Sequence, residues 1–213
     1  RMLLRRAVGL AAARFLAAMV CLGNGVYRLH GVPRMHERPQ AALFAALREL
    51  GYRIDTPNDK LPAVIAGGAD LLVGQDARQR VPTRRCRVSI TESSQFASAL
   101  LLSAKTGGWE VEIEGENSDE SPYVEMTKEM IKTFPHSGGT FQIEPDASSG
   151  SYFWAAATWT WNEPKRDKHD EDTWCECIPR IMVKAWPKSG WQMDANFLLW
   201  IIAASAANNR SAA

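Results

Sequence analysis

The stretch Ser89–Ala104, SITESSQFASALLLSA, places hydroxyl and amide side chains directly before an apolar run. Residues 87–90 read as a short strand, and the run from Phe96 to Leu102 is apolar enough for a buried helix. After Gly107-Gly108, the segment Trp109–Glu114, WEVEIE, alternates apolar and acidic residues, which predicts a strand with one wet face. The stretch therefore predicts a strand–helix–strand unit.

Two amphipathic helices are predicted on either side of this unit. One begins at Pro39 and ends at Gly51, and the other covers 122–134, PYVEMTKEMIKTF, before Pro135. Their apolar faces are formed by Leu43, Ala46, Leu47 and Leu50 in the first helix and by Val124, Thr127, Ile131 and Phe134 in the second.

Short strand candidates alternate with these helices: Val26–Leu29, Ala63–Ala66, Leu71–Val73, Arg87–Ile90 and Thr140–Glu144. This rhythm predicts an α/β protein whose helices cover the faces of sheets. The segment Ser148–Ala155, SSGSYFWA, also echoes Ser93–Leu100, SSQFASAL. A repeated supersecondary unit of about fifty residues explains the echo, and so does the frequency of Ser and Ala.

Charge is balanced over the whole chain but not along it. The 213 residues include 25 Lys and Arg and 24 Asp and Glu, so the average composition gives no support to nucleic-acid binding. Residues 1–60 carry ten basic and four acidic side chains, whereas residues 109–146 carry two and ten. This asymmetry fits a basic site for acidic small molecules, and it also fits two solvated faces, which is the commoner case.

Cysteine is rare, at Cys21, Cys86, Cys175 and Cys177, and lacks the spacing of a secreted disulfide framework. A reducing, cytoplasmic compartment is therefore expected. Cys175-Glu-Cys177 with His169 nearby does not supply four ligands at the spacing of a closed zinc site, so no metal is predicted.

The N-terminal segment carries arginines before an apolar run, as signal and transit peptides do. Arg14 interrupts that run, and the pieces at 7–13 and 15–22 are far shorter than the ~20 residues of a bilayer span. We expect a soluble protein with no membrane partner.

Ser93, Ser94 and Gln95 stand where the predicted helix begins. A helix N-terminus presents unpaired backbone N–H groups and a partial positive charge, which together bind phosphate or carboxylate. Ser93 is equally suited to cap the helix, although capping needs one such residue and not three in a row. Ligand binding and capping therefore both stay open.

Two arginines lie in the segment PRMHERP at 33–39, between a strand candidate and a helix. The planar guanidinium offers paired donors to carboxylate or phosphate, a geometry that lysine lacks. We assign Arg34 to ligand binding and Arg38 to the scaffold, where Glu37 or Glu49 would hold it.

A third group of polar residues occurs in EPDASSGSYF at 144–153, where Asp146 precedes Ser148 and an apolar helix. Asp146 is suited to cap that helix, which we favour, or to orient a substrate hydroxyl.

Four segments together resemble the enolpyruvyl transferase family, and within it the 5-enolpyruvylshikimate 3-phosphate synthases. They are LHGVPRMHERPQAALFAALRELGYRI at 29–54, SSQFASALLLSA at 93–104, SPYVEMTKEMIKTF at 121–134 and EPDASSGSYFWAAA at 144–157. They follow the family's order, and the resemblance spans roughly two thirds of the chain, from Leu22 to Ala157.

The resemblance implies an inside-out α/β barrel of repeated βαβαββ units, of which this chain carries one lobe and part of a second. It implies transfer of the enolpyruvyl group from phosphoenolpyruvate to shikimate 3-phosphate, without metal or organic cofactor. By the same resemblance, Arg34 holds phosphoenolpyruvate and Arg14 matches the arginine after the first substrate loop. Shikimate 3-phosphate is expected to contact Ser93, Ser94, Gln95 and Tyr123, with Asp146 and Ser148 as further candidates.

The chain departs from the family pattern at three places. Val8, Gly9, Leu10 and Ala11 replace the first loop's Asn-Ala-Gly-Thr, and Glu120 replaces a serine, where it would repel a phosphate if it pointed inward. The family's acid–base Asp, Glu and Lys have no recognisable counterpart after Ala157, so no catalytic residue is assigned.

We interpret residues 1–157 as the first lobe and the start of a second, and 158–213 as a divergent segment, with a boundary near 158–173. The first hypothesis is a shikimate-pathway transferase of aromatic amino acid biosynthesis, either divergent or truncated. The second is a catalytically silent ligand-binding fragment. The third is an enolpyruvyl transferase that uses a nucleotide sugar, which would require a reactive cysteine in a mobile loop.

Overall fold

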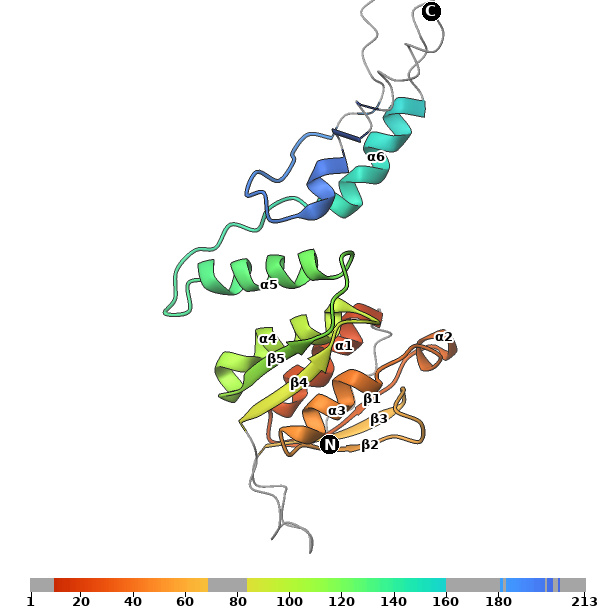
Figure 1. Ribbon diagram of the computed structural model, residues 1–213, viewed down its shortest axis with the longest axis vertical. Helices are drawn as coiled ribbons and strands as arrows, with labels where there is room; N and C mark the ends of the chain where they lie inside the picture. Colours follow the sequence, from red (N-terminus) through yellow and green to blue (C-terminus); the bar gives the residue numbers. More distant parts are fainter. Residues whose placement is uncertain are drawn as a thin grey trace, which may run out of the picture. The chain divides into compact units, whose positions relative to one another are not determined.

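The computed structural model describes residues 10–68, 84–159, 181, 183–197, 199–200 and 203. The chain divides into two compact units, unit 1 (Arg1–Thr133) and unit 2 (Phe134–Ala213), and each is described by itself (Figure 1). Helices and small sheets alternate, so the predicted mixed α/β class is confirmed. The predicted strand Leu71–Val73 and most of the predicted boundary segment 158–173 lie outside the described residues, and the boundary stays a prediction.

Unit 1 contains a three-stranded antiparallel sheet in the order β1-β3-β2. Its strands are β1 (Gly25–Leu29), β2 (Arg53–Asp55) and β3 (Ala63–Gly67), with Tyr27 opposite Ile65. Ala63 and Ile65 are fully buried and alternate with partly exposed neighbours, as expected for a sheet with one face on the core.

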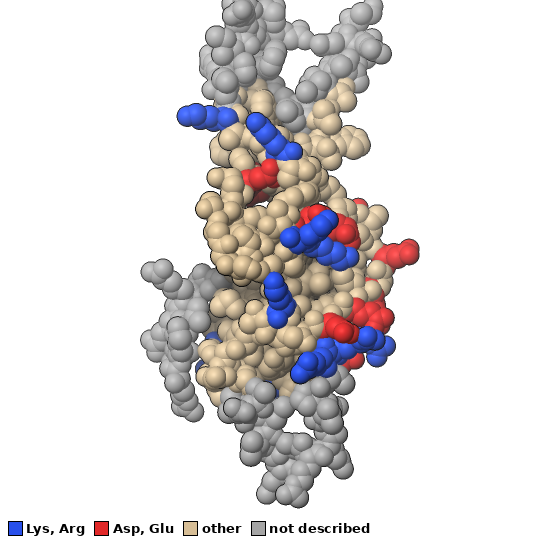
Figure 2. All heavy atoms as spheres, turned by 90° about the vertical axis from the view of Figure 1, so that its left-hand side faces the viewer, with Lys and Arg blue, Asp and Glu red and all other residues tan. Residues whose placement is uncertain are grey.

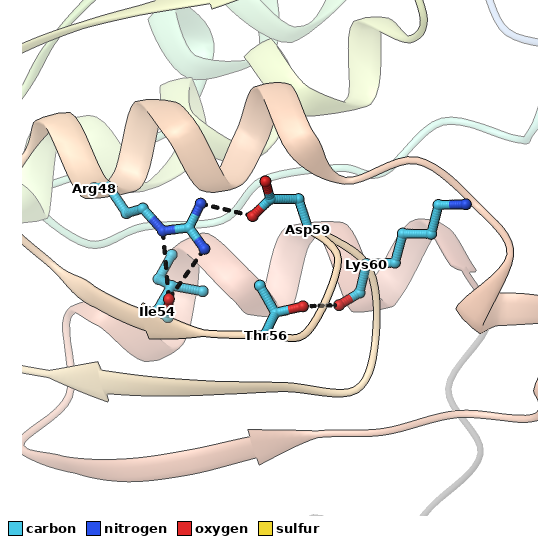
Figure 3. Close-up of polar contacts among 5 residues, drawn as sticks. All are labelled: Arg48, Ile54, Thr56, Asp59 and Lys60. Atoms are coloured by element: carbon cyan, nitrogen blue, oxygen red, sulfur yellow. Dashed lines mark hydrogen bonds and ion pairs between the residues drawn. The ribbon is translucent and has the colours of Figure 1, made fainter.

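Arg48 ties this sheet to the helix before it (Figure 3). From helix α3 (Ala41–Glu49) it donates to the Ile54 carbonyl oxygen and forms an ion pair with Asp59 at 2.7 Å. The Thr56 hydroxyl donates to the Lys60 carbonyl at 2.6 Å and closes the same β2–β3 connection.

The strand–helix–strand unit forms as predicted. Strand β4 (Arg85–Ser89) and strand β5 (Glu110–Glu114) pair in parallel, and helix α4 (Ser94–Gly107) connects them. Gly108 adopts a left-handed conformation, with φ of 67°, and ends α4. The parallel register sets Arg85 opposite Glu110, and their side chains form an ion pair at 2.8 Å.

Opposite charges also mix elsewhere on the surface. Arg87 on β4 lies 3.6 Å from Glu114 on β5 and 3.7 Å from Glu49 on α3. Figure 2 shows basic and acidic side chains lying next to one another on the face that it presents. Much of the acidic stretch is therefore a solvated, paired face.

Helix α4 lies at the centre of the core of unit 1. It packs against α1 (Leu10–Cys21), α3, α5 (Ser121–Thr133) and both strands of its own sheet (Figure 1). The buried face of α4 includes Phe96, Ala97 and Leu100, all fully inaccessible. The predicted face of α3 is confirmed, with Leu43, Ala46, Leu47 and Leu50 each at most 5% exposed.

Three details differ from the sequence expectations. Helix α3 begins at Ala41 and not at Pro39, because Pro39 and Gln40 precede its first turn. Phe134 lies one residue past α5 and is 48% exposed, so it does not belong to the buried face. The connection between β1 and α3 contains one short helix, α2 (Pro33–His36).

Unit 2 contains helix α6 (Ala147–Trp159) and the 3₁₀ helix η2 (Met193–Asn196). The predicted strand Thr140–Glu144 is wrong: these residues form no strand, and Ile143 is 78% exposed. Glu144 instead accepts bonds from the backbone N–H groups of Lys188 and Ser189 at 2.9 and 2.8 Å. The segment is therefore an extended connection held by side-chain contacts.

Within the described parts of the chain, no helix has both the length and the apolar character that crossing a bilayer requires.

Candidate functional site

The first turn of α4 is capped by its own sequence. Ser93 has extended backbone angles, φ of −173° and ψ of 131°, and its hydroxyl accepts the N–H of Gln95 at 3.3 Å. The N–H of Phe96 reaches the Ser93 carbonyl oxygen at 3.4 Å. Capping, one of the two uses considered for Ser93, is confirmed.

The guanidinium of Arg14 forms hydrogen bonds to residues at the start of α4. Its Nη1 donates to the Ser93 hydroxyl at 2.9 Å and to Oε1 of Gln95 at 2.8 Å, and its Nη2 donates to the Pro39 carbonyl at 3.2 Å. Arg14 comes from α1, about eighty residues away in sequence from its α4 partners. Three residues predicted for the site, Arg14, Ser93 and Gln95, therefore lie together.

Arg14 is 6% exposed, and the Cζ of its guanidinium lies 4.6 Å from the ring centroid of Phe96. Its Nε has no partner among the described residues. Burial lowers the pKa of Arg14, and the positive charge of Arg38 lowers it further, whereas Glu120 and Glu92 act in the opposite direction. Since arginine titrates far above neutrality, Arg14 remains a cation.

Glu120 reaches the same turn from the loop before α5. Its Oε2 accepts the backbone N–H of Ser94 at 2.5 Å. Asn117 holds this loop, because its Oδ1 accepts the N–H groups of Asp119 and Glu120 at 3.0 and 3.3 Å, and its Nδ2 donates to the Thr91 carbonyl. The replacement of the family serine by Glu120 thus points inward, at the helix N-terminus.

Arg34 and Arg38 are both exposed, and neither side chain has a hydrogen-bond or ion-pair partner among the described residues. Arg38 forms neither of its expected ion pairs, with Glu37 or Glu49, among the described residues, and Glu49 accepts the backbone N–H of Arg87 at 2.9 Å. The positive charge of Arg38 lowers the pKa of Arg14. The described contacts include none between Arg34 and α4, so the ligand role of Arg34 stays a prediction.

Tyr123 lies on the first turn of α5 and is partly buried. Its carbonyl oxygen accepts the hydroxyl of Thr127 at 2.9 Å, and that hydroxyl also lies 2.8 Å from the hydroxyl of Ser98 on α4. This buried pair fixes the start of α5 against α4. The contact of Tyr123 with shikimate 3-phosphate stays a prediction.

In unit 2, Asp146 caps α6, which is the use that the sequence favoured. Its carboxylate accepts the N–H of Ser148 at 3.0 Å and the hydroxyl of Ser149 at 2.5 Å, which together lower the pKa of Asp146. The hydroxyl of Ser148 donates to Asp194. The predicted substrate contacts of Asp146 and Ser148 stay predictions.

Sequence reasoning missed two features of this site. Arg38 was assigned to the scaffold because acidic residues adjoin it in sequence, and only the three-dimensional structure relates its charge to Arg14. Gln40, beside Pro39, is 1% exposed, and both polar atoms of its amide lack partners among the described residues. The apolar surroundings of Gln40 in the sequence gave no signal for it.

No group of three or more His, Cys, Asp or Glu suited to a metal occurs among the described residues. Cys175, Cys177 and His169, considered as metal ligands, lie outside them.

The family model for EPSP synthase (3-phosphoshikimate 1-carboxyvinyltransferase) matches residues 4–163, about three quarters of the chain. The chain belongs to the EPSP synthase family. The match covers the α1, α4 and α5 residues that form the site, so the Arg14–Ser93–Gln95 contact lies inside the EPSP synthase domain.

Curated relatives agree with this assignment. A 3-phosphoshikimate 1-carboxyvinyltransferase of Trichormus variabilis is 37% identical over 177 residues, covering 72% of this chain and 39% of the relative. One from Burkholderia vietnamiensis is 35% identical over 170 residues, covering 68% of this chain and 37% of the relative. The chain thus spans about two fifths of the length of the curated EPSP synthases that it matches.

Proposed function

We propose that this chain supplies the shikimate 3-phosphate side of a 3-phosphoshikimate 1-carboxyvinyltransferase. The observation that carries the proposal is the buried Arg14 guanidinium, which joins Ser93 and Gln95 at the start of α4. A cation, a capped helix N-terminus and an amide side chain then converge on one turn. That combination suits a small, hydroxyl-bearing anion. Membership of the EPSP synthase family, whose name contains 3-phosphoshikimate, supports shikimate 3-phosphate as this anion.

In the proposed reaction, a hydroxyl oxygen of shikimate 3-phosphate bonds to the central carbon of phosphoenolpyruvate and the hydroxyl proton is released, while the methylene carbon of phosphoenolpyruvate takes up a proton. The resulting tetrahedral intermediate loses phosphate and its methyl group gives up a proton, which restores the carbon–carbon double bond. The described residues contribute positioning and charge: Gln95 binds the acceptor substrate, while Arg14 and Arg38 provide positive potential. Arg34 is kept as the predicted phosphoenolpyruvate ligand.

The finer architecture belongs to the same proposal. We infer an inside-out barrel of repeated βαβαββ units, supported by the β4–α4–β5 unit and by the serine echo, which falls at the starts of both α4 and α6. A cytoplasmic compartment is supported by the free, buried thiols of Cys21 and Cys86.

A second candidate function, a ligand-binding part that needs further chain for turnover, is favoured by the length comparison. The relatives are more than twice as long as the matched region, and the family's acid–base groups were not recognised in this sequence. The nucleotide-sugar alternative loses support among the described cysteines, because Cys21 and Cys86 are buried and burial raises the pKa of both thiols.

The test measures shikimate 3-phosphate binding by calorimetry and phosphate release after phosphoenolpyruvate is added. We expect Gln95→Ala to weaken shikimate 3-phosphate binding about tenfold, because the hydrogen bond between the Gln95 amide and the substrate is lost. Gln142→Ala, which removes an exposed amide in unit 2, is the matched control and should bind as the wild type does.

Phosphate release by the chain alone supports the complete transferase. Release only after a second-lobe polypeptide is added supports the ligand-binding part. Equal affinities for the wild type and Gln95→Ala reject the role of Gln95, and absence of binding to either substrate rejects the proposed function.

A further inference from the structure

The backbone donors at the start of α4 are already satisfied within the chain. The N–H of Gln95 bonds the Ser93 hydroxyl and the N–H of Phe96 bonds the Ser93 carbonyl, both local capping contacts. The N–H of Ser94 is different, because its acceptor is a charged carboxylate from another segment, Oε2 of Glu120 at 2.5 Å. A carboxylate therefore occupies the position where a helix N-terminus attracts an anion.

The surroundings of this contact are built for negative charge. The adjoining Arg14 is 6% exposed, contacts both residues that flank Ser94, and keeps an Nε without a partner among the described residues. The negative charge of Glu120 raises the pKa of Arg14, so the two side chains interact electrostatically. The buried guanidinium, whose Nη1 bonds the residues on both sides of Ser94, is a second indication, independent of the helix itself, that the turn accepts an anion.

The Glu120 side chain can leave without unfolding the loop. The backbone N–H of Glu120 is held by Asn117 Oδ1 at 3.3 Å, and the next N–H, of Ser121, bonds the Asn117 carbonyl at 2.9 Å. These bonds fix the main chain and leave the side-chain torsions of Glu120 as the means of moving its carboxylate.

We propose that Glu120 is a resident anion of the α4 N-terminus, which a phosphate group must displace from the Ser94 N–H in order to bind. The naming of shikimate 3-phosphate as the displacing ligand rests on the proposed function. A phosphate dianion and a carboxylate on the same donor repel each other, so Glu120 selects against weakly held phosphates. It also keeps the helix end satisfied when no ligand is bound.

The test compares two variants with a control in the full-length chain. Glu120→Gln removes the charge and keeps an oxygen acceptor for the Ser94 N–H, and Glu120→Ser removes the side chain as well. Asp119→Asn is the control, because it removes the same charge one residue away from an exposed side chain that does not contact Ser94. Circular dichroism verifies that each variant is folded.

The probes are inorganic phosphate, followed by the amide resonance of Ser94 in NMR, and shikimate 3-phosphate, followed by calorimetry. We expect both Glu120 variants to bind inorganic phosphate and shikimate 3-phosphate about tenfold or more tighter than the wild type, with Asp119→Asn unchanged. Unphosphorylated shikimate should bind equally to all four proteins, because it brings no phosphate to the contested donor.

Each outcome decides between the two claims. The resident anion is overturned if the wild type binds inorganic phosphate and shikimate 3-phosphate as tightly as both Glu120 variants do, or more tightly. It is also overturned if Asp119→Asn tightens binding by the same factor as the Glu120 variants. Tighter inorganic phosphate at Ser94 without any binding of shikimate 3-phosphate retains the resident anion and removes the proposed function. If no folded variant binds either inorganic phosphate or shikimate 3-phosphate, the resident anion and the proposed function are both rejected.

Discussion

At the scale of single residues, Arg14 belongs to the fold as much as to the site. Its three donated bonds join α1 to the start of α4 and to the segment before α3. A cation with 6% exposure and three acceptors is costly to remove, since one buried and two partly buried acceptors lose their donor.

We therefore expect Arg14→Ala to lower the free energy of unfolding by about 2–4 kcal/mol, measured by urea denaturation. Arg34→Ala is the matched control. It removes an exposed arginine without a partner among the described residues, so a change within about 0.5 kcal/mol is expected. Equal stability of the two variants would show that the buried contacts of Arg14 contribute little.

Residue types in the sequence were sufficient to indicate this turn but not its internal pairing. Three polar residues before an apolar run identified Ser93, Ser94 and Gln95, because helix ends have known requirements. The sequence did not reveal that Arg14 and Glu120 are their partners, since those contacts join residues 26 to 81 positions apart. The ion pairs expected of Arg38 were inferred from its neighbours in sequence, and they do not occur among the described residues.

At the scale of helices and strands, periodicity identified the elements of unit 1 well. The face of α3 and the alternation in β5 follow from the periods of 3.6 and 2, which single segments carry by themselves. Thr140–Glu144 has suitable alternation but no partner strand among the described residues. Strand formation needs a neighbour, and alternation alone does not supply one.

Glu144 provides a prediction for this connection. The Ser189 hydroxyl and the Lys188 N–H lower the pKa of the Glu144 carboxyl, so its folded-state pKa lies below the ordinary 4.5. The contribution to stability is present above pH 4.5 and is lost as the pH falls through the lowered value. We expect Glu144→Gln to increase hydrogen exchange at 186–191 at pH 7, and the wild type to approach that behaviour in acid, after correction for intrinsic rates.

Glu129→Gln serves as the control for this measurement, because it loses a surface carboxylate on α5, 3.6 Å from Lys132. Its exchange at 186–191 should equal that of the wild type. Unchanged exchange in Glu144→Gln would mean that the connection is held by other contacts, such as the bond from Gln192 to the Pro145 carbonyl.

At the scale of the whole molecule, the two halves of the charge asymmetry have different explanations. Glu110 and Glu114 of β5 pair with arginines of β4, which is the solvated face that composition favoured. The basic N-terminal segment supplies Arg14 to the start of α4, and the charge of Arg38 lowers the pKa of Arg14. Composition alone left both readings open because it does not record which charges meet.

Two thiols report on the integrity of unit 1. Burial raises the pKa of Cys21 to about 12, and burial together with the charge of Glu49 raises the pKa of Cys86 to about 11. At pH 8 we expect both thiols to react with iodoacetamide about 100-fold more slowly in the native chain than in denaturant, because labelling requires opening of the core. Peptide mapping by mass spectrometry separates them from Cys175 and Cys177.

The same shifts predict a loss of stability in alkali. A raised folded-state pKa means that the neutral thiol is favoured in the native protein, so the contribution is complete below pH 9.0 and declines as the pH rises toward the folded values. Cys21→Ala should show a shallower decline of its urea midpoint between pH 8 and pH 10 than the wild type. Rapid native labelling of Cys21 or Cys86 would contradict this account.

The central position of α4 couples recognition to cohesion. The helix whose first turn is the proposed anion site also packs on α1, α3, α5 and both of its strands. Any compound that binds at that turn therefore stabilises unit 1 against thermal unfolding. The gain in the free energy of unfolding grows with the logarithm of the ratio of ligand concentration to dissociation constant. An inhibitor aimed at this turn would act as a pharmacological chaperone for the polypeptide that it blocks.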